Sequence, residues 1–178
     1  TIFVRYCPNY FSGKAGFLMK EQLLELLQQN ARLTNAELAV MLDTTEAEVA
    51  DAIRALENDG VIKGYSAIVD DELANKDMVT AIIELRVTPQ RDSGYEEIAH
   101  TIMQYDEVES IALMAGAYDL SVTVRGTNVK DVSMFVSQRL ATLAGVLSTA
   151  TYFVLKKYKE KGIIIEGEEK DERGYYFP

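Results

Sequence analysis

The chain has 178 residues, of which 48% are hydrophobic, so it can form one or two compact domains with apolar cores. Its longest apolar stretch, residues 79–87, is shorter than the roughly 18 residues of a membrane span, and its single cysteine, Cys7, excludes an internal disulfide. A formal net charge of −10 opposes any general attraction for nucleic acid, so a DNA-binding function would require a local basic surface.

Residues 1–18 differ from the rest of the chain. They show neither helical nor strand periodicity, and Pro8, Gly13 and Gly16 interrupt regular structure. They also lack the leucine-rich core and the small-residue cleavage site of a signal peptide. We expect a leader that is not native, with the natural start at Met19; a functional arm is the alternative.

Residues 19–65 have the pattern of three short helices. Leucines at helical spacing predict the first helix over residues 20–30. Two capping boxes of the form Thr-x-x-Glu, beginning at Thr34 and Thr45, predict the starts of the second and third helices, because hydroxyl and carboxylate there satisfy backbone amides that no helical bond reaches.

The third helix is predicted to end at Asn58. Gly60 suits the left-handed conformation that closes many helices, and the extended residues 61–65 follow it. Three helices, a short break between the last two and a final strand predict a winged helix-turn-helix. We call residues 19–65 the reader domain; an ordinary three-helix packing unit is the alternative interpretation.

The remainder of the chain changes to a strand-rich pattern. Residues 66–77 are polar and predict a linker with one strand, and residues 161–178 predict a C-terminal tail or hairpin. Between them, residues 78–160 predict a ferredoxin-like βαββαβ domain, so that the whole chain is an α+β protein. Its strands are expected at 79–87, 108–115, 119–125 and 146–155, and its helices at 93–105 and after a cap at Asn128.

Two helices can cover only one face of such a sheet. The other face is predicted to carry mixed polar side chains that suit contact with a second copy of the chain, namely Glu84, Arg86, Ser121, Thr123, Thr149 and Thr151. The lysine run at residues 156–161 is interpreted as a solvated strand end, with DNA contact as the alternative.

Particular residues in both domains carry a resemblance to a known family. They are Leu38-Ala39, Val49, Ile53, Leu56-Glu57, the run Gly60–Ala67, the loop Ala115–Asp119, and the segments Leu143–Val146 and Thr149–Tyr152. These residues resemble the Lrp/AsnC family of transcription regulators, and residues 20–159 follow its pattern without a large insertion. Ala144 departs from the pattern, because the family usually has proline there.

The resemblance implies a cytoplasmic regulator that binds double-stranded DNA. Its third helix would enter the major groove, and its sheet domain would form a homodimer that assembles into a tetramer or octamer. DNA contacts are expected at Thr34, Asn35, Thr44, Thr45, Asp51, Arg54, Asn58 and Lys63.

The reader domain departs from the family in its charge. Family members usually carry several basic residues on the third helix, whereas Arg54 is the only one here between Asp43 and Asp59. Because carboxylates oppose phosphates, we expect modest and strongly salt-sensitive DNA affinity. Arg32 and Lys63, with Arg5 and Lys14 from the leader, are the other expected cationic contributors.

The resemblance also implies a small effector, commonly an amino acid, bound near a glycine-containing loop. The expected residues are Met114, Ala115, Gly116, Ala117, Tyr118 and Asp119. Asp119 could pair with the ammonium of an amino acid, while amides around Gly116 could receive its carboxylate. The structural alternative is that the loop is only a hairpin turn in which Asp119 bonds to local amides.

Two other functions are alternatives for this sequence. Some proteins built like this family decarboxylate sirohaem, but the one histidine, His100, offers little support for a tetrapyrrole enzyme, so we expect no enzyme and no cofactor or metal. An amino-acid-sensing oligomer with weak or lost DNA binding, acting through protein partners, is the second alternative.

Overall fold

The computed structural model describes residues 14–71, 73–74, 78–89 and 94–165, and side chains from residue 18 onward. The chain divides into two compact units, residues 1–67 and residues 68–178. Each unit has its own hydrophobic core. Within the described residues, no helix is both long and apolar enough to cross a membrane.

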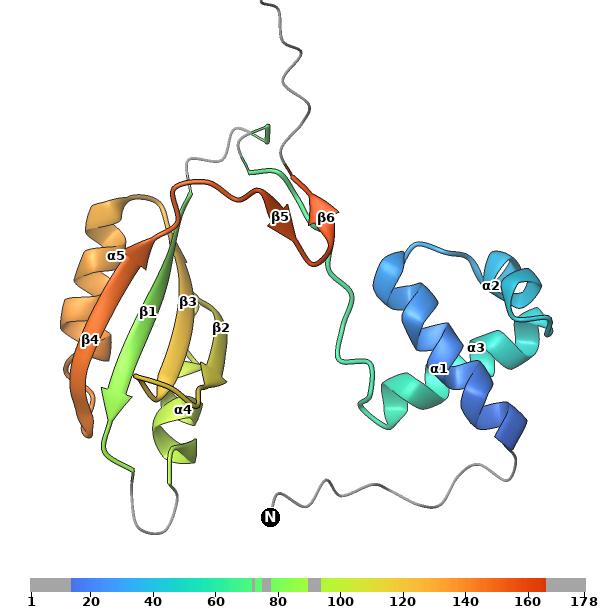
Figure 1. Ribbon diagram of the computed structural model, residues 1–178, viewed down its shortest axis with the longest axis horizontal. Helices are drawn as coiled ribbons and strands as arrows, with labels where there is room; N and C mark the ends of the chain where they lie inside the picture. The colour runs from blue at the N-terminus through green and yellow to red at the C-terminus, as the bar shows by residue number, and fades with distance from the viewer. Residues whose placement is uncertain (1–13, 72, 75–77, 90–93, 166–178) are drawn as a thin grey trace, which may run out of the picture. The chain divides into compact units, whose positions relative to one another are not determined.

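The described part of the first unit contains three helices, α1 (Lys14–Gln29), α2 (Asn35–Met41) and α3 (Glu46–Asn58) (Figure 1). They share one apolar core, in which Leu23, Leu38 and Val49 are fully buried. The helix predicted over residues 20–30 begins earlier, at Lys14, so the end of the segment expected to be a leader is helical.

The chain reverses direction after α2 and after α3 through a residue with positive φ. After α2, Asp43 adopts a left-handed conformation with φ of 51°, and the Thr44 amide donates to the Ala39 carbonyl oxygen. After α3, Gly60 has φ of 66°, and the amides of Gly60 and Val61 donate to Glu57 and Leu56. Both ends have the left-handed closure that reverses the chain, as predicted at Gly60.

The strand expected within residues 66–77 is not formed in the described part of that range, and residues 61–65 form no strand either. A strand is defined by hydrogen bonds to a neighbouring strand, and the described part of the first unit contains no strand to pair with. The extended pattern of residues 61–65 is therefore not sufficient to form a strand.

The second unit contains the predicted βαββαβ order. Its strands pair antiparallel in the order β2-β3-β1-β4. The elements are β1 (Val79–Val87), α4 (Glu96–Ile102), β2 (Val108–Leu113), β3 (Leu120–Gly126), α5 (Val129–Phe135), the π-helical turn η1 (Val136–Leu140) and β4 (Val146–Phe153). Asn128 caps α5 as expected, since its side chain accepts from the Asp131 amide at 2.9 Å.

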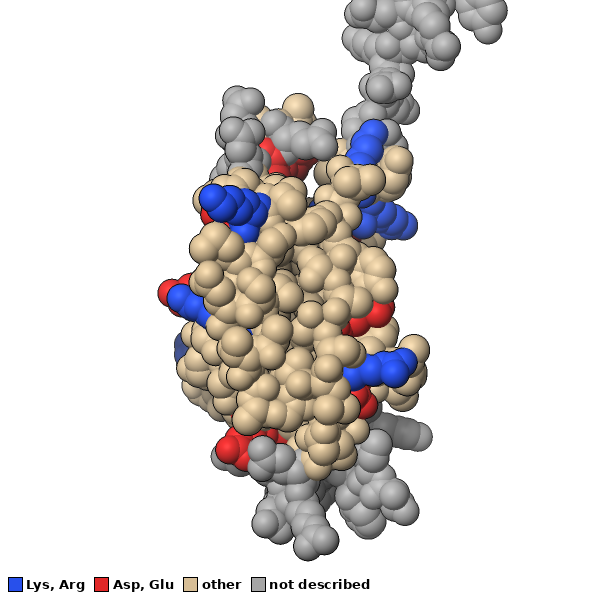
Figure 2. All heavy atoms as spheres, turned by 90° about the vertical axis from the view of Figure 1, so that its left-hand side faces the viewer, with Lys and Arg blue, Asp and Glu red and all other residues tan. Residues whose placement is uncertain are grey.

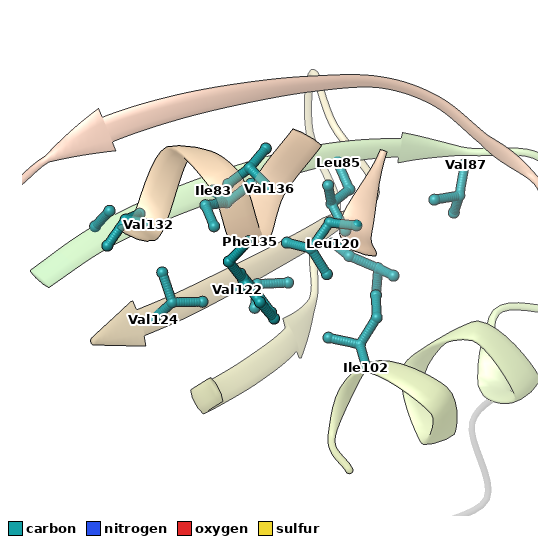
Figure 3. Close-up of a cluster of buried hydrophobic side chains, with 12 residues drawn as sticks. Ile83, Leu85, Val87, Ile102, Leu120, Val122, Val124, Val132, Phe135 and Val136 are labelled. Carbon is teal, nitrogen blue, oxygen red and sulfur yellow. The ribbon is translucent and has the colours of Figure 1, made fainter. Parts of the chain in front are cut away.

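Helices α4 and α5 cover one face of the sheet. Ile83 and Leu85 of β1 and Val122 of β3 point toward Phe135 and Ile102 of the helices (Figure 3). Alternation along β1 and β3 places the polar residues Glu84, Arg86, Ser121 and Thr123 on the opposite, open face, as predicted.

The prediction for β4 was wrong. Thr149 pairs with Leu85 and Thr151 with Ile83, so both threonines lie on the helix-covered face. Ser148, Ala150 and Tyr152 lie on the open face instead. The sequence of β4 has apolar residues at both parities, so its alternation does not define which face is buried.

A short hairpin follows the sheet. It consists of β5 (Lys159–Glu160) and β6 (Ile163–Ile164), joined by Lys161 and Gly162, both with positive φ. A two-residue turn with positive φ at both positions fits the twist of paired strands. This hairpin is not the one expected within residues 161–178, because residues 166–178 are outside the described residues.

Candidate functional site

Helix α3 is held so that one face is buried and the opposite face is exposed. Val49, Ala52 and Leu56 pack into the core of the first unit. The other side carries what we call the α3 outer face, namely Ala47, Asp51, Arg54 and Asn58, and all four are exposed. The segment that was expected to contact DNA therefore projects outward.

The three threonines predicted to contact DNA have structural partners. Thr34 forms the capping box with Glu37, and Thr45 forms the second with Glu48. Thr44 also donates its hydroxyl to Glu48. The bond from Thr44 and the two from Thr45 hold the pKa of Glu48 below its ordinary value, and bonds from Thr34 lower the pKa of Glu37.

Arg54 and Asp51 form an ion pair on the α3 outer face. The Arg54 Nη1 donates to Asp51 Oδ1 at 3.0 Å, and the two side chains are 67% and 73% exposed. The only cation of α3 is thus neutralised by its neighbour three residues earlier. An exposed pair of this kind contributes little to stability and can open readily.

The remaining predicted DNA-contacting residues flank this face. Asn35 is exposed at the first position of α2, and Lys63 is exposed after the end of α3. A Cβ built on Gly60 would lie 2.8 Å from the Lys63 Nζ, so the lysine ammonium lies against the C-terminal end of α3. The partial negative charge of a helix C-terminus favours a cation there.

Tyr65 helps to position the residues that follow α3, a role that the sequence pattern did not identify. Its hydroxyl donates to Glu57 Oε1 at 3.0 Å and so ties residues 61–65 to α3. Desolvation, and then the bond and charge of Glu57, raise the pKa of Tyr65. Its spacing of eight residues from Glu57 follows no helical or strand rule.

The predicted effector loop, residues 114–119, connects β2 to β3. Residues 114–117 are exposed, and Tyr118 and Asp119 are half-buried. The backbone closes the loop, since the Met114 amide donates to the Asp119 carbonyl at 2.8 Å. The Asp119 amide donates to the Leu85 carbonyl at 2.9 Å, which fixes the base of the loop to β1.

The Asp119 carboxylate has a structural role. The Val87 amide donates to Oδ2 at 2.9 Å, and the Tyr95 hydroxyl donates to Oδ1 at 3.2 Å. Desolvation, and then the nearby Asp119 carboxylate, raise the pKa of Tyr95. The amide that binds the carboxylate is not in the loop, as the structural alternative expected, but on β1, 32 residues earlier, and Tyr95 lies 24 residues earlier.

Gly116 has no structural requirement within a single chain. Its φ lies outside the left-handed range, and a Cβ built on it meets no heavy atom within 4 Å. The backbone conformation at position 116 therefore does not require glycine. The loop leaves free space above its backbone.

The described residues hold no group of three His, Cys, Asp or Glu side chains able to bind a metal ion. His100 is exposed in the last turn of α4. Cys7 and Arg5 lie outside the described residues, and the side chain of Lys14 is also outside them.

Comparison with known proteins assigns both units. Residues 80–164 match the Lrp/AsnC ligand-binding domain, and residues 19–63 match a winged helix-turn-helix DNA-binding domain. The predicted fold class is thereby confirmed.

Two curated relatives are named as regulators. The uncharacterized HTH-type transcriptional regulator YugG of Bacillus subtilis is 43% identical over 85% of this chain and 92% of its own length. The HTH-type transcriptional regulator LysM of Sulfurisphaera tokodaii is 34% identical over 76% of this chain and 91% of its own length.

A solved structure agrees with this assignment. A transcriptional regulator from Neisseria meningitidis, crystallised as a complex with L-Met, superimposes with a TM-score of 0.65 at 27% identity. The match covers 84% of this chain and 94% of the other. This chain therefore belongs to the Lrp/AsnC family of transcription regulators and, as the sequence predicts, is not an enzyme.

Proposed function

We propose that this regulator binds specific double-stranded DNA through the α3 outer face and changes that binding when an amino acid occupies the loop 114–119. It acts in the cytoplasm as a homodimer that assembles into a tetramer or octamer. The observation that carries the proposal is the outward projection of α3 from a capped three-helix core. The sensor without DNA binding has no support from the relatives above, which are named as transcription regulators.

The DNA contact would depend on few charges. Arg54 and Lys63 lie on and beside α3, and Asn58 and Asn35 add side chains able to bond to bases or phosphates without net charge. Carboxylates outnumber cations in the reader domain, nine Asp/Glu to four Lys/Arg over residues 20–65. Binding by one reader domain is therefore weak, and several reader domains on one DNA supply the necessary effective concentration.

The effector would bind over the exposed part of the loop. Asp119 Oδ1 and Oδ2 each accept one bond, and a carboxylate oxygen can accept more than one, so the ammonium of an amino acid can still pair with it. The space above Gly116 lets a carboxylate approach the loop amides. The L-Met complex of the Neisseria regulator supports an amino acid as the class of ligand.

The open face of the sheet supports self-association. Ile82 of β1 is 39% exposed and Tyr152 of β4 is 53% exposed, beside the polar side chains of Glu84 and Thr123. The Tyr152 hydroxyl donates to Glu84 Oε2 at 3.2 Å, so these two polar groups already have a hydrogen-bond partner before a second copy binds. A second sheet packed on this face would cover the apolar groups.

The β4 side of the same unit offers a further contact for assembly. Figure 2 shows mainly uncharged surface there, with Lys, Arg, Asp and Glu around its margin. β4 pairs only with β1 in the described sheet, and its Leu147 side chain is 70% exposed. An edge strand with an apolar side chain is suited to association with another copy.

The test is selection of duplexes from a randomised DNA pool by the full chain, with and without a panel of the twenty amino acids. We expect one enriched sequence whose recovery changes with one or a few amino acids. Gly116→Val should remove that response while leaving DNA selection intact, because the space above the loop is filled without disturbing the fold. Failure to enrich any sequence at low salt would refute the proposal.

A further inference from the structure

The Asp51–Arg54 pair is not explained by stability or by DNA affinity. Both side chains are mainly exposed, so their 3.0 Å contact contributes little to folding. Asp51 also places a negative charge on the face that must approach phosphates, which lowers affinity for all DNA. A feature that costs general affinity is explained if it distinguishes one sequence from another.

Asp51 differs from the other carboxylates of α3. Glu48 is occupied by the bonds of the capping box, and Glu57 accepts from the Tyr65 hydroxyl. Glu46 lies in the first turn, where a negative charge complements the helix dipole. Asp51 is the one that bonds to the single cation of the α3 outer face.

We propose that the Asp51–Arg54 pair reads one G·C base pair in the major groove. The inference rests on the proposed function, because it requires the α3 outer face to lie in that groove. The guanine edge presents two acceptors, N7 and O6, and the cytosine edge presents the N4 amino donor beside them. Arg54 supplies the two donors for guanine, and Asp51 supplies the adjacent acceptor for cytosine.

The geometry of the pair matches this edge. Residues three apart on a helix rise by about 4.5 Å and share one face, so both side chains reach the same region of the groove. The ion pair already places a donor group next to an acceptor group at 3.0 Å. A T·A or A·T pair presents an acceptor, a donor and a further acceptor, and a C·G pair presents the reverse order, so one base pair in one orientation fits.

The test uses full-length protein and the randomised duplex pool, with Asp51→Ala, Arg54→Ala and the matched control Glu25→Ala. Glu25 is an exposed carboxylate of α1, so its removal changes the reader charge by the same amount away from α3. Circular dichroism checks that each variant keeps its helices. Asp51→Asn serves as a second variant, because its amide oxygen can still accept from cytosine.

We expect the wild type to require G·C at one position of each half-site. Asp51→Ala and Arg54→Ala should each reduce discrimination at that position by about tenfold or more, as expected for one base contact. Asp51→Asn should retain part of the preference, and Glu25→Ala should retain all of it. If Asp51→Ala keeps the wild-type preference at every position, the inference is overturned while the proposed function stands; if the wild type selects no sequence, both fail.

Discussion

Replacing Asp119 separates the structural role of the loop from its role in ligand binding. Asp119→Ala removes the acceptor for the Val87 amide, and the Val87 residue is 3% exposed. A bond from an amide to a charged acceptor contributes about 1.5–3 kcal/mol, and a buried donor left without a partner costs a similar amount. We therefore expect Asp119→Ala to lower the free energy of unfolding by about 2 kcal/mol.

The loss is large enough to measure by thermal unfolding. For a domain of this size, 1 kcal/mol corresponds to roughly 4–8 °C in Tm, so Asp119→Ala should lower the Tm of the second unit by about 8–16 °C. Asp106→Ala, at an exposed carboxylate of the same unit, is the control and should change Tm little. Tyr95→Phe should give a smaller loss than Asp119→Ala, because the Val87 bond remains.

Asp119→Asn completes the comparison. The amide oxygen can face the Val87 amide, while the amide nitrogen donates to the Tyr95 hydroxyl, so the loop keeps its geometry without the charge. We expect near-native Tm with loss of the response to an amino-acid effector, measured by calorimetric titration. If Asp119→Ala unfolds at the wild-type temperature, the carboxylate does not hold the loop, and this reasoning is refuted.

Three further predictions concern the framework. Gly60→Ala forces an alanine to a φ of 66° and should destabilise the reader domain by about 1 kcal/mol in urea unfolding; no loss would show that the helix end can rearrange. Folding lowers the pKa of Glu48, so the ionised carboxylate contributes to stability above about pH 4.3, and this contribution is lost as the pH falls through the lowered pKa. Glu48→Gln should therefore reduce the fall of Tm at acid pH. An unchanged fall would contradict the capping interpretation. Ile83→Ala empties a fully buried position and should cost about 2–5 kcal/mol by chemical denaturation, against about 0.5–1.5 for Ile83→Val; equal losses would argue against a closely packed core.

The features that could be predicted from sequence were those set by local chemistry. Both capping boxes form because Thr and Glu three residues apart satisfy amides within the same turn. Strand β1 has the predicted bounds, and its burial alternates regularly from Ala81 to Val87. The left-handed Gly60 is likewise a property of a few neighbouring residues.

The features that could not be predicted depend on partners distant in sequence. The parity of β4 is decided by its pairing with β1, about 65 residues earlier, and not by its own alternation. The Tyr95–Asp119 bond crosses from the start of α4 to the loop after β2. The same holds for the linker strand expected within residues 66–77, which the described residues of that range do not form.

The candidate DNA site shows the same division. The sequence placed Asp51 and Arg54 on one face of α3, which the helix confirms, and their ion pair follows from the i, i+3 spacing. It predicted the capping boxes of Thr34 with Glu37 and Thr45 with Glu48, but not the additional bond that the Thr44 hydroxyl donates to Glu48. A hydroxyl that could bind either DNA or a neighbouring carboxylate can be assigned to one of them only when the positions of its neighbours are known.

The most direct test of the account is the affinity of the full chain for its selected duplex, measured by fluorescence anisotropy over a range of salt concentrations. Wild type is compared with Arg54→Ala and with Lys130→Ala, which removes the same charge from an exposed position on α5. The account predicts that Arg54→Ala weakens binding by about tenfold or more, while Lys130→Ala leaves it unchanged. Equal affinity of Arg54→Ala and the wild type at every salt concentration would contradict the claim that α3 lies on DNA.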